Sequence, residues 1–495
     1  SVAILSTQSF SGNSFCGPNA PMQSHFSEQQ GAVARINKVA EGHRNRPFVL
    51  TADRGRGKSS ALGIAAANLM QLKTINICVT APHFRNVEQV FFHVKRLLPE
   101  ASIDRYTASF QSSSLTFKPL DILIGATEKC DLLLVDEASA IPVHLLNQLA
   151  TKFTRVVFCS TVHGYEGSGR GFEMRFVKQL GQIKPDFKRY QMQQPIRWYQ
   201  DDALEQFWFN TLFHSEFTQH EKPDELNQAI SCRQVSQAQL LSDKKLLRGL
   251  FQLLIDAHYQ TSQDDLQRLL DAPEIACFVL NKGTKVLGVL QVIKEGGESI
   301  ADLAQDISEC TRRVNGHLVV QNITSSYNLP QFLRSPQWRI SRIAIAPEYQ
   351  RQGLGKTLLK YVEQQAKQQN ITWLTTSFGC NTDILRFWNK HDFLLAKLSA
   401  KPEVSSGEHS AICIKPLLNT VEALSNKIQH AFFQDMLYQI DKDFRLLSEM
   451  LLIQIVKSLP CDTRSPLANL DILQQFANGK RPYSSCKRIL KDYLL

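Results

Sequence analysis

The chain has 495 residues, of which 43% are apolar and 21% are charged, and its formal net charge is +10. This composition predicts a folded protein of about three domains and excludes a disordered chain. No apolar run approaches the roughly 20 residues of a membrane span, and the 11 cysteines include no CxxC pair, which favours reduced thiols in a cytoplasmic protein over disulfides or zinc.

The first half of the chain predicts an α/β domain. Residues 1–26 are rich in Ser, Asn, Gly and Pro and predict a flexible lead-in. Over residues 27–230 short β-type runs alternate with helical stretches, which indicates a parallel sheet with helices on both faces. The expected strands are Phe48–Thr51, Thr74–Thr80, Ile122–Ile124, Asp131–Val135 and Arg155–Ser160.

A second α/β domain is predicted over residues 231–416, in which 231–275 form a helical connection. Its first two strands are expected as a hairpin, Cys277–Leu280 and Val286–Ile293, joined by a glycine-containing turn. Residues 417–495 read as a helical tail that becomes basic towards its end.

A phosphate-binding loop follows the first predicted strand. Gly55 and Gly57 let the backbone approach phosphates at a helix N-terminus, Lys58 would contact the β- and γ-phosphates, and Ser59 would bind Mg²⁺. The usual first glycine is Ala52 here, so a chance Gly-Lys-Ser in a loop is the alternative. The predicted ATP-binding loop comprises Ala52, Asp53, Arg54, Gly55, Arg56, Gly57, Lys58, Ser59 and Ser60.

Two adjacent carboxylates end a later apolar strand. Asp136 is expected to hold Mg²⁺ and Glu137 to orient the attacking water, a pattern typical of ATP hydrolysis. A buried strand with a solvated acidic end is the alternative. Ser160-Thr161 ends the next strand, where helicase-like ATPases have a coupling motif. Arg197 is a candidate arginine finger, with a surface salt bridge as the other reading, and Gly164–Gly171 predicts a mobile loop.

A second nucleotide-type loop lies in the second domain. Gln350–Gly355 follows a strand-like run and precedes the amphipathic stretch Lys356–Gln368, so its backbone amides would face a pyrophosphate at a helix N-terminus. The order of elements resembles the GNAT-type N-acetyltransferase fold. That resemblance implies that the backbone amides of Ile343–Ile345 polarise a thioester carbonyl. The expected acetyl-CoA residues are Ile343, Ala344, Ile345, Gln350, Arg351, Gln352, Gly353, Leu354, Gly355 and Lys356.

The strings TADRGRGKSS, LLLVDEASAIP and RISRIAIAPEYQRQGLG are similar to those of the bacterial tRNA(Met) cytidine acetyltransferases. The resemblance covers roughly residues 27–415. It implies that ATP and acetyl-CoA are used to form N4-acetylcytidine at the wobble position of elongator methionine tRNA. It further implies that Gln29 reads the adenine of ATP, that Arg197 contacts ATP, and that Asp383 and Lys390 lie at the far side of the acetyl-CoA site.

The chain departs from this family in two respects. Members usually carry a sizeable domain ahead of the position of Gln29, so the resemblance raises the expectation of a shortened chain. They often have histidine where this chain has Ala346, which removes one general base. The sequence does not choose among the other proton acceptors, namely His317, Tyr327, Glu348 and His391.

Two rival functions remain open at this stage. A protein lysine acetyltransferase regulated by ATP would acetylate peptides without RNA, and an RNA-remodelling ATPase with a non-catalytic acetyltransferase fold would not bind acetyl-CoA. The net positive charge suits a tRNA partner. The expected tRNA contacts in the tail are Lys480, Arg481, Lys487 and Arg488, with a merely solvated terminus as the alternative.

Overall fold

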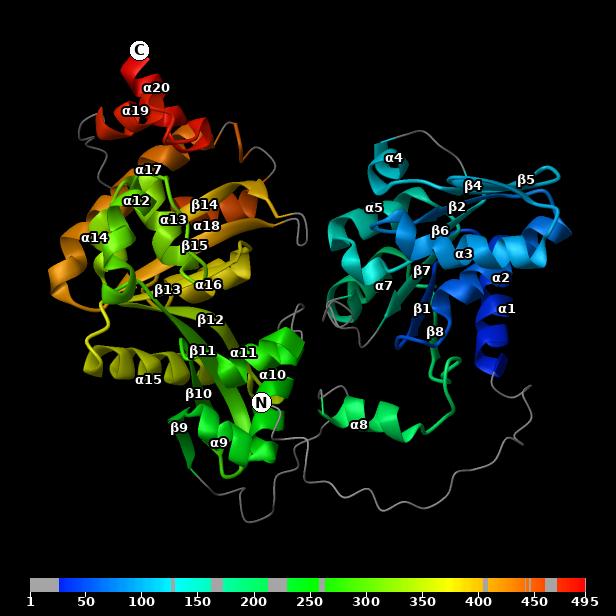
Figure 1. Cartoon of the computed structure of the whole chain (residues 1–495), viewed down its shortest axis with the longest axis horizontal. Helices are drawn as coiled ribbons and strands as arrows, with labels where there is room; N and C mark the ends of the chain where they lie inside the picture. The colour runs from blue at the N-terminus through cyan, green and yellow to red at the C-terminus, as the bar shows by residue number, and fades with distance from the viewer. Residues whose placement is uncertain are drawn as a thin grey trace.

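The computed structural model describes residues 26–125, 130–161, 172–211, 229–257, 263–403, 408–440, 442–444, 447–458 and 470–494. These residues form two α/β modules, each built on its own sheet (Figure 1). Residues 1–25 of the predicted lead-in and the segment Gly164–Gly171 lie outside the described residues. Among the described helices, none is long and apolar enough to cross a membrane.

The first module contains an eight-stranded sheet in the order β3-β4-β5-β2-β6-β7-β1-β8. Neighbouring strands from β5 to β8 are parallel, and the β3–β4 hairpin extends the sheet in antiparallel fashion beside β5. The strands are β1 (Phe48–Ala52), β2 (Asn76–Thr80), β3 (Ser102–Asp104), β4 (Thr107–Phe110), β5 (Ser113–Phe117), β6 (Leu132–Val135), β7 (Val156–Thr161) and β8 (Lys188–Met192).

Helices cover both faces of this sheet, as the alternating pattern predicts. One face packs against α1 (Ser27–Glu41), α2 (Lys58–Leu72) and α3 (Phe84–Leu97). The other packs against α4 (Leu120–Gly125), α5 (Val143–Lys152) and α7 (Lys178–Ile183). The central strands β1 and β6 are wholly buried, which explains their continuous apolar runs.

One predicted strand is wrong. Ile122–Ile124 lies within helix α4, where Leu123 is fully buried and Ile122 is 45% exposed. The strand in this part of the chain is β5, which pairs with β2. Its serine- and threonine-rich sequence lacks a strong apolar pattern, so the sequence does not predict this strand.

The second module contains a seven-stranded sheet in the order β14-β15-β13-β12-β11-β10-β9. Only β12 and β13 are parallel neighbours; the other pairs are antiparallel, and the predicted β10–β11 hairpin is present. The strands are β9 (Ile230–Val235), β10 (Ile275–Lys282), β11 (Lys285–Glu295), β12 (Gln337–Ile345), β13 (Trp373–Gly379), β14 (Leu394–Pro402) and β15 (His409–Pro416).

Two apolar cores flank this second sheet. The smaller lies under α9 (Gln237–Ser242), α10 (Lys244–Ala257) and α11 (Gln263–Asp271). Residues 231–275 are therefore part of the module, and β9 is its edge strand, which corrects the predicted helical connection. The larger core lies under α12 (Ala304–Ser308), α13 (Leu318–Tyr327), α14 (Pro330–Arg334), α15 (Leu354–Gln368), α16 (Thr382–Asn389), α17 (Glu422–Gln439) and α18 (Glu449–Val456).

The predicted tail divides into two parts. Helices α17 and α18 contribute Ile428, Phe432 and Ile455 to the larger core, so the module extends well beyond residue 416. Helices α19 (Leu470–Ala477) and α20 (Lys487–Leu494) share a separate small apolar cluster. The final two helices are therefore the part of the chain that needs polar attachment to the module.

Arg481 supplies such an attachment. Its side chain is buried, and the guanidinium donates hydrogen bonds to the carbonyl oxygens of Ser308 and Ser325 and to the side chain of Gln475. A guanidinium enclosed in this way is not available to an RNA phosphate. The expectation that Arg481 contacts tRNA is therefore corrected, because burial gives this residue a structural role.

We expect Arg481→Ala to release α19 and α20 from the module. The carbonyl oxygens of Ser308 and Ser325 would lose this donor, which costs about 1–3 kcal/mol at the buried Ser308 bond and less at the partly buried Ser325 bond. Hydrogen exchange should show faster exchange in these two helices while the central strands stay protected. Lys480→Ala is the matched control, since its ion pair with Glu309 is partly exposed and should contribute little. Equal exchange in both variants would contradict this role.

Candidate ATP and acetyl-CoA sites

The phosphate-binding loop joins β1 to α2. Gly55 and Gly57 have φ angles of 81° and 76°, which favour glycine, and α2 begins at Lys58. The buried Lys58 ammonium donates hydrogen bonds to the carbonyl oxygens of Ala52 and Asp53, both at 3.1 Å. The helix N-terminus and this ammonium together provide an anion-binding site.

The two predicted catalytic carboxylates lie at the end of β6. Asp136 is fully buried, and burial raises its pKa to about 6 although the neighbouring Ser59 hydroxyl opposes this shift. Its Oδ1 accepts a hydrogen bond from the amide of Glu137. Glu137 has a left-handed backbone with φ 48° and ψ 44°, a conformation that few non-glycine residues adopt.

The residues present fit a magnesium ion that enters with the nucleotide. Asp136 Oδ2 is buried and has no hydrogen-bond partner among the described residues. No group of three or more His, Cys, Asp or Glu side chains suited to a metal occurs in the described part of the chain. Mg²⁺ usually takes one or two protein ligands and completes its shell with phosphates and water, so one buried carboxylate can serve it.

The predicted coupling motif contacts Glu137, the second of the two predicted catalytic carboxylates. Thr161, at the end of β7, donates a hydrogen bond from its hydroxyl to Glu137 Oε2 at 3.4 Å. The strands β6 and β7 are parallel neighbours, so their carboxyl ends meet at one edge of the sheet. A shift of β7 would therefore be transmitted to Glu137.

Two distant segments enclose the phosphate-binding loop. The Gln29 side chain of α1 donates a hydrogen bond to the carbonyl oxygen of Gly57 at 3.2 Å. From the other side, Ile196 donates its amide to the carbonyl oxygen of Gly55. A Cβ added at Gly57 would lie 2.2 Å from Ile196, and one added at Gly55 would lie 2.6 Å from Trp198. The neighbouring Arg197 is exposed.

An ion pair that sequence reasoning missed extends this enclosure. Arg56 pairs with Glu205 of α8 (Ala203–Thr211) at 2.7 Å, and both side chains are mostly buried. The Arg56 guanidinium also lies 5.7 Å from the Trp198 ring. Helix α8 has no buried residue of its own, and this ion pair attaches it to the loop. Arg56 and Glu205 are 149 positions apart, so no local pattern in the sequence indicates that they pair.

We expect Glu205→Ala to detach α8 from the phosphate-binding loop. A buried Arg56 without its partner carboxylate is costly, and breaking such pairs typically costs about 3–5 kcal/mol when burial is complete. Limited proteolysis should cleave α8 faster in this variant than in the wild type. Glu88→Ala, an exposed substitution on α3, is the control. Unchanged cleavage would show that the ion pair does not tether α8.

The second predicted loop joins β12 to α15. Arg351 and Gly353 have φ angles of 62° and 83°, and Gly353 directly precedes α15, which begins at Leu354. A Cβ added at Gly353 would meet nothing within 4 Å, so the loop surface is open. Gln350 is fixed by a hydrogen bond from its side chain to the carbonyl oxygen of Ile345. The exposed helix N-terminus fits a pyrophosphate.

Strands β12 and β13 diverge beside this loop. They pair only from Gln337 to Ile340 on β12, after which a bulge at Ser341 interrupts the register with β11. The Ala346 amide donates a hydrogen bond to the carbonyl oxygen of Leu287 on β11. Successive amides of a strand point to opposite sides, so the Ala344 amide also faces β11. The amides of Ile343 and Ile345 therefore face the opening between β12 and β13. Two of the three predicted amides are therefore positioned to polarise a carbonyl.

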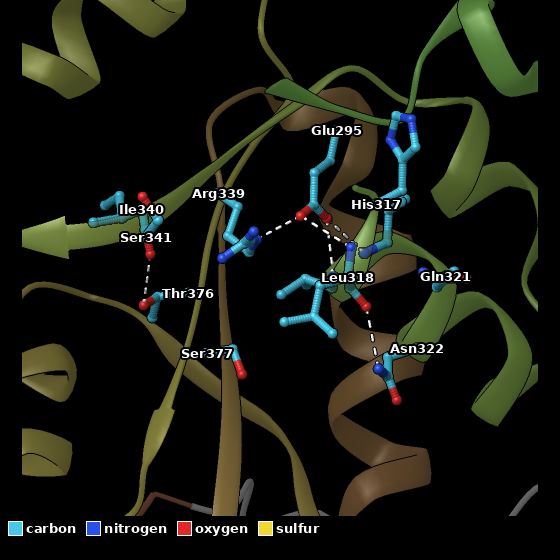
Figure 2. Close-up of polar contacts among 12 residues, drawn as sticks. Glu295, His317, Leu318, Gln321, Asn322, Arg339, Ile340, Ser341, Thr376 and Ser377 are labelled. Carbon is cyan, nitrogen blue, oxygen red and sulfur yellow. Dashed lines mark hydrogen bonds and ion pairs between the residues drawn. The ribbon is translucent and has the colours of Figure 1, made fainter. Parts of the chain in front are cut away.

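A buried carboxylate holds the other end of β12 (Figure 2). Glu295 accepts hydrogen bonds from the backbone amides of Leu318, Val319 and Val320 at the N-terminus of α13, and from the Arg339 side chain. Thr376 of β13 donates to the carbonyl oxygen of Ile340, the last paired position. These contacts fix where the two strands separate.

A basic cavity of about 830 Å³ runs along α15 and begins at Lys356, the last residue of the predicted acetyl-CoA loop. Lys390, which the resemblance places at the far side of the acetyl-CoA site, lines it as well. Asp383, at the opposite end of α16, does not line this cavity, and its side chain is 95% exposed. The structure therefore brings Lys390, and not Asp383, together with the start of α15.

The four candidate proton acceptors are not equivalent. Tyr327 is buried, donates to the carbonyl oxygen of Ala396, and has a pKa raised by burial, so it is structural. His317 accepts the Gly296 amide at Nδ1, and in Figure 2 its ring lies on the far side of Glu295 from Ser341. Burial and Lys415 lower the pKa of His391 in the basic cavity. Glu348 pairs with Lys285 next to the loop.

Comparison with known proteins assigns both modules. Residues 49–215 match the model of the RNA cytidine acetyltransferase NAT10/TcmA helicase domain, and residues 249–369 and 356–418 match that of GNAT acetyltransferase 2. The first module is thus similar to the helicase domain of the RNA cytidine acetyltransferases, and the second is similar to a GNAT acetyltransferase domain. The predicted order, a helicase-like module followed by an acetyltransferase module, is thereby confirmed.

Related proteins of other organisms align with most of the chain. The tRNA(Met) cytidine acetyltransferase TmcA of Nitrosococcus halophilus is 38% identical over 93% of this chain and 62% of its own length. That of Vibrio cholerae is 37% identical over 95% of this chain and 65% of its own length. That of Thermococcus kodakarensis is 32% identical over 78% of this chain and 49% of its own. The chain thus spans less than two thirds of each relative.

Proposed function

We propose that the chain acetylates the exocyclic N4 of the wobble cytidine of elongator tRNA(Met), with acetyl-CoA as acetyl donor and ATP hydrolysis driving the exposure of the base. The observation that carries this proposal is the pairing of two complete nucleotide loops, one on each sheet, in the order found in this family. The named relatives support the choice of tRNA as substrate.

In the acetyl transfer, the cytidine amine attacks the thioester carbonyl, a new C–N bond forms, and the coenzyme A thiolate leaves. The amine is conjugated and weakly nucleophilic, so positioning and carbonyl polarisation should account for much of the rate. The amides of Ile343 and Ile345 supply that polarisation at the strand opening. Glu348 and His391 are the acceptors nearest to the loop and the basic cavity for the proton that N4 loses.

In ATP hydrolysis, Lys58 and the N-terminus of α2 bind the phosphates, and Ser59 and Asp136 would hold Mg²⁺, which offsets the phosphate charge when bound. Glu137 orients the attacking water, and Thr161 relays movement of β7 to that carboxylate. Arg197 is proposed to contact ATP, because it lies between Ile196 and Trp198, which enclose the loop. A wobble base must leave its stack before acetylation, and the ATPase supplies the work.

The test is acetylation of unfractionated tRNA. The protein is incubated with acetyl-CoA, ATP and total tRNA, and the digested nucleosides are analysed by mass spectrometry. We expect N4-acetylcytidine that depends on both co-substrates. Acetyl-lysine in added proteins, formed without RNA, would support a protein acetyltransferase instead, and RNA-stimulated ATP hydrolysis without acetyl-CoA binding would support an RNA-remodelling ATPase.

We further propose that Lys480, Lys487 and Arg488 contact the tRNA backbone. Each pairs with a carboxylate of the second module: Lys480 with Glu309, Lys487 with Asp443, and Arg488 with Asp435. A phosphate of the tRNA would have to displace that carboxylate. Replacing all three by glutamine should reduce the magnitude of the log–log salt slope of tRNA binding by roughly 0.7–0.9 per lost contact. An unchanged slope would show that these side chains serve only the fold.

A further inference from the structure

A pocket of about 730 Å³ opens on the first module at the carboxyl ends of β2 and β5. Its walls come from the segment after β2, the tip of the β3–β4 hairpin, the residues after β5, and helices α4 and α5. Figure 1 shows α4, β4 and β5 gathered on one side of this module. Ligands of open α/β sheets bind outside the carboxyl ends of the strands. No residue of this pocket is used by either nucleotide site.

Three aromatic side chains form one wall of the pocket. Phe84 contacts Tyr106 and Phe117 edge to face, with ring centroids 5.0 and 5.3 Å apart, and Tyr106 lies 6.0 Å from Phe117. Tyr106 is 40% exposed although it belongs to this cluster. Its main chain is fixed by a hydrogen bond from the Phe117 amide to the Tyr106 carbonyl oxygen. The rings therefore present an accessible face on a rigid support.

One cation contacts these rings, and two more are adjacent to them in the chain. The Arg105 guanidinium lies 5.1 Å from the centre of the Tyr106 ring, and Arg85 and Lys118 directly follow Phe84 and Phe117 in the chain. The same segments hold three cations and two carboxylates, Asp104 and Asp121, of which Asp121 lines the pocket. Aromatic platforms combined with cations are the usual way in which proteins bind single-stranded RNA, since the rings stack on bases and the cations attract the backbone.

The pocket is connected to the ATP site through the main chain. Ala81, the first residue of its wall, follows Thr80, whose carbonyl oxygen accepts a 2.9 Å hydrogen bond from the amide of Asp136. Strands β2 and β6 are parallel neighbours at this edge. An occupant that presses on the end of β2 therefore acts on the strand end that carries Asp136.

We propose that this pocket binds an unstacked nucleobase of the substrate RNA, with the base stacked on Tyr106 and lying against Phe84 and Phe117. The inference depends on the proposed function in one respect, that RNA is the substrate. It adds where the first module binds that RNA, and it explains how a base bound in the pocket would affect Asp136 at the ATP site. Stacking alone makes the pocket tolerant of base identity, because every base has a π face.

The test uses an anticodon stem-loop RNA of tRNA(Met) with 2-aminopurine in its loop. Stacking on Tyr106 should quench the fluorescence on binding to the full chain. Tyr106→Ala should weaken binding roughly 5- to 150-fold, the range that corresponds to loss of one stacked base, and reduce the quenching. Tyr106→Phe should restore both, because the ring remains. Phe92→Ala, which removes an exposed ring of α3 outside the pocket, is the matched control.

The outcomes separate this inference from the proposed function. If the wild type acetylates tRNA cytidine and Tyr106→Ala binds the RNA as tightly as the wild type, the pocket assignment is wrong and the function stands. If the wild type quenches and binds as expected but forms no acetylcytidine, the pocket assignment stands and the function is wrong. Retained ATP binding by Tyr106→Ala verifies that the module is folded, and failure of Tyr106→Phe to restore binding would also overturn the inference.

Discussion

Lys58→Ala is expected to lower ATP hydrolysis by roughly two orders of magnitude or more, the loss typical for removal of a positioned charge from a transition state. The Lys58 ammonium is buried within the phosphate-binding loop, and no other lysine belongs to that loop. Acetyl-CoA affinity, measured by calorimetry, should stay unchanged, because the acetyl-CoA loop belongs to the second sheet. Steady-state ATPase assays provide the first measurement.

The matched control is Lys38→Ala, which removes an exposed lysine from α1 of the same module. It should leave both activities as in the wild type. If Lys58→Ala weakened acetyl-CoA binding as strongly as ATP hydrolysis, the two loops would not act as separate sites.

Gly355→Glu should abolish acetyl-CoA binding while ATP hydrolysis continues. Gly355 lies in the first turn of α15, so a carboxylate there would place a negative charge where the helix N-terminus is proposed to bind the pyrophosphate. The substitution should not disturb the fold, since an added Cβ would first meet Phe387 at 3.7 Å, an ordinary contact distance. Calorimetry with acetyl-CoA measures the binding loss.

Gly355→Gln separates charge from bulk. The glutamine has the same size as glutamate and no charge, so it should retain more affinity than the glutamate variant. Equal binding by Gly355→Glu and the wild type would show that acetyl-CoA does not use this loop.

The sequence predicted the nucleotide loops well because each is encoded locally. At Gly57 a glycine at positive φ, a helix start and the end of a buried strand lie within a few residues of one another, and at Gly353 a glycine at positive φ directly precedes a helix start. The strands β1, β6 and β7 were predictable for a related reason. They are buried on both faces, and their continuous apolar runs are distinctive.

Edge strands were the elements that the sequence concealed. β9 is half-exposed and mixes Ser, Cys, Arg and Gln with two apolar residues, so neither face gives a clear period of two. Its assignment comes from pairing with β10, a contact between segments that are distant in the sequence.

Long-range polar contacts were equally inaccessible. Arg56 pairs with Glu205, which lies far along the chain on α8. Arg481 is held by carbonyl oxygens of residues more than 150 positions earlier in the chain. The basic composition of the tail was read as a solvent-facing surface. The sequence shows that a residue is basic, but it does not show whether a carboxylate or a carbonyl oxygen of the same chain already binds that side chain.

The central claim is that the ATP site and the acetyl-CoA site together serve the acetylation of one cytidine. The most direct measurement follows radiolabelled acetyl transfer from acetyl-CoA to two tRNA(Met) transcripts, one unaltered and one with uridine at the wobble position, each with and without ATP. We predict label only in the unaltered transcript and a strong requirement for ATP. Label of equal strength in the uridine transcript, or transfer unaffected by ATP, would contradict the account.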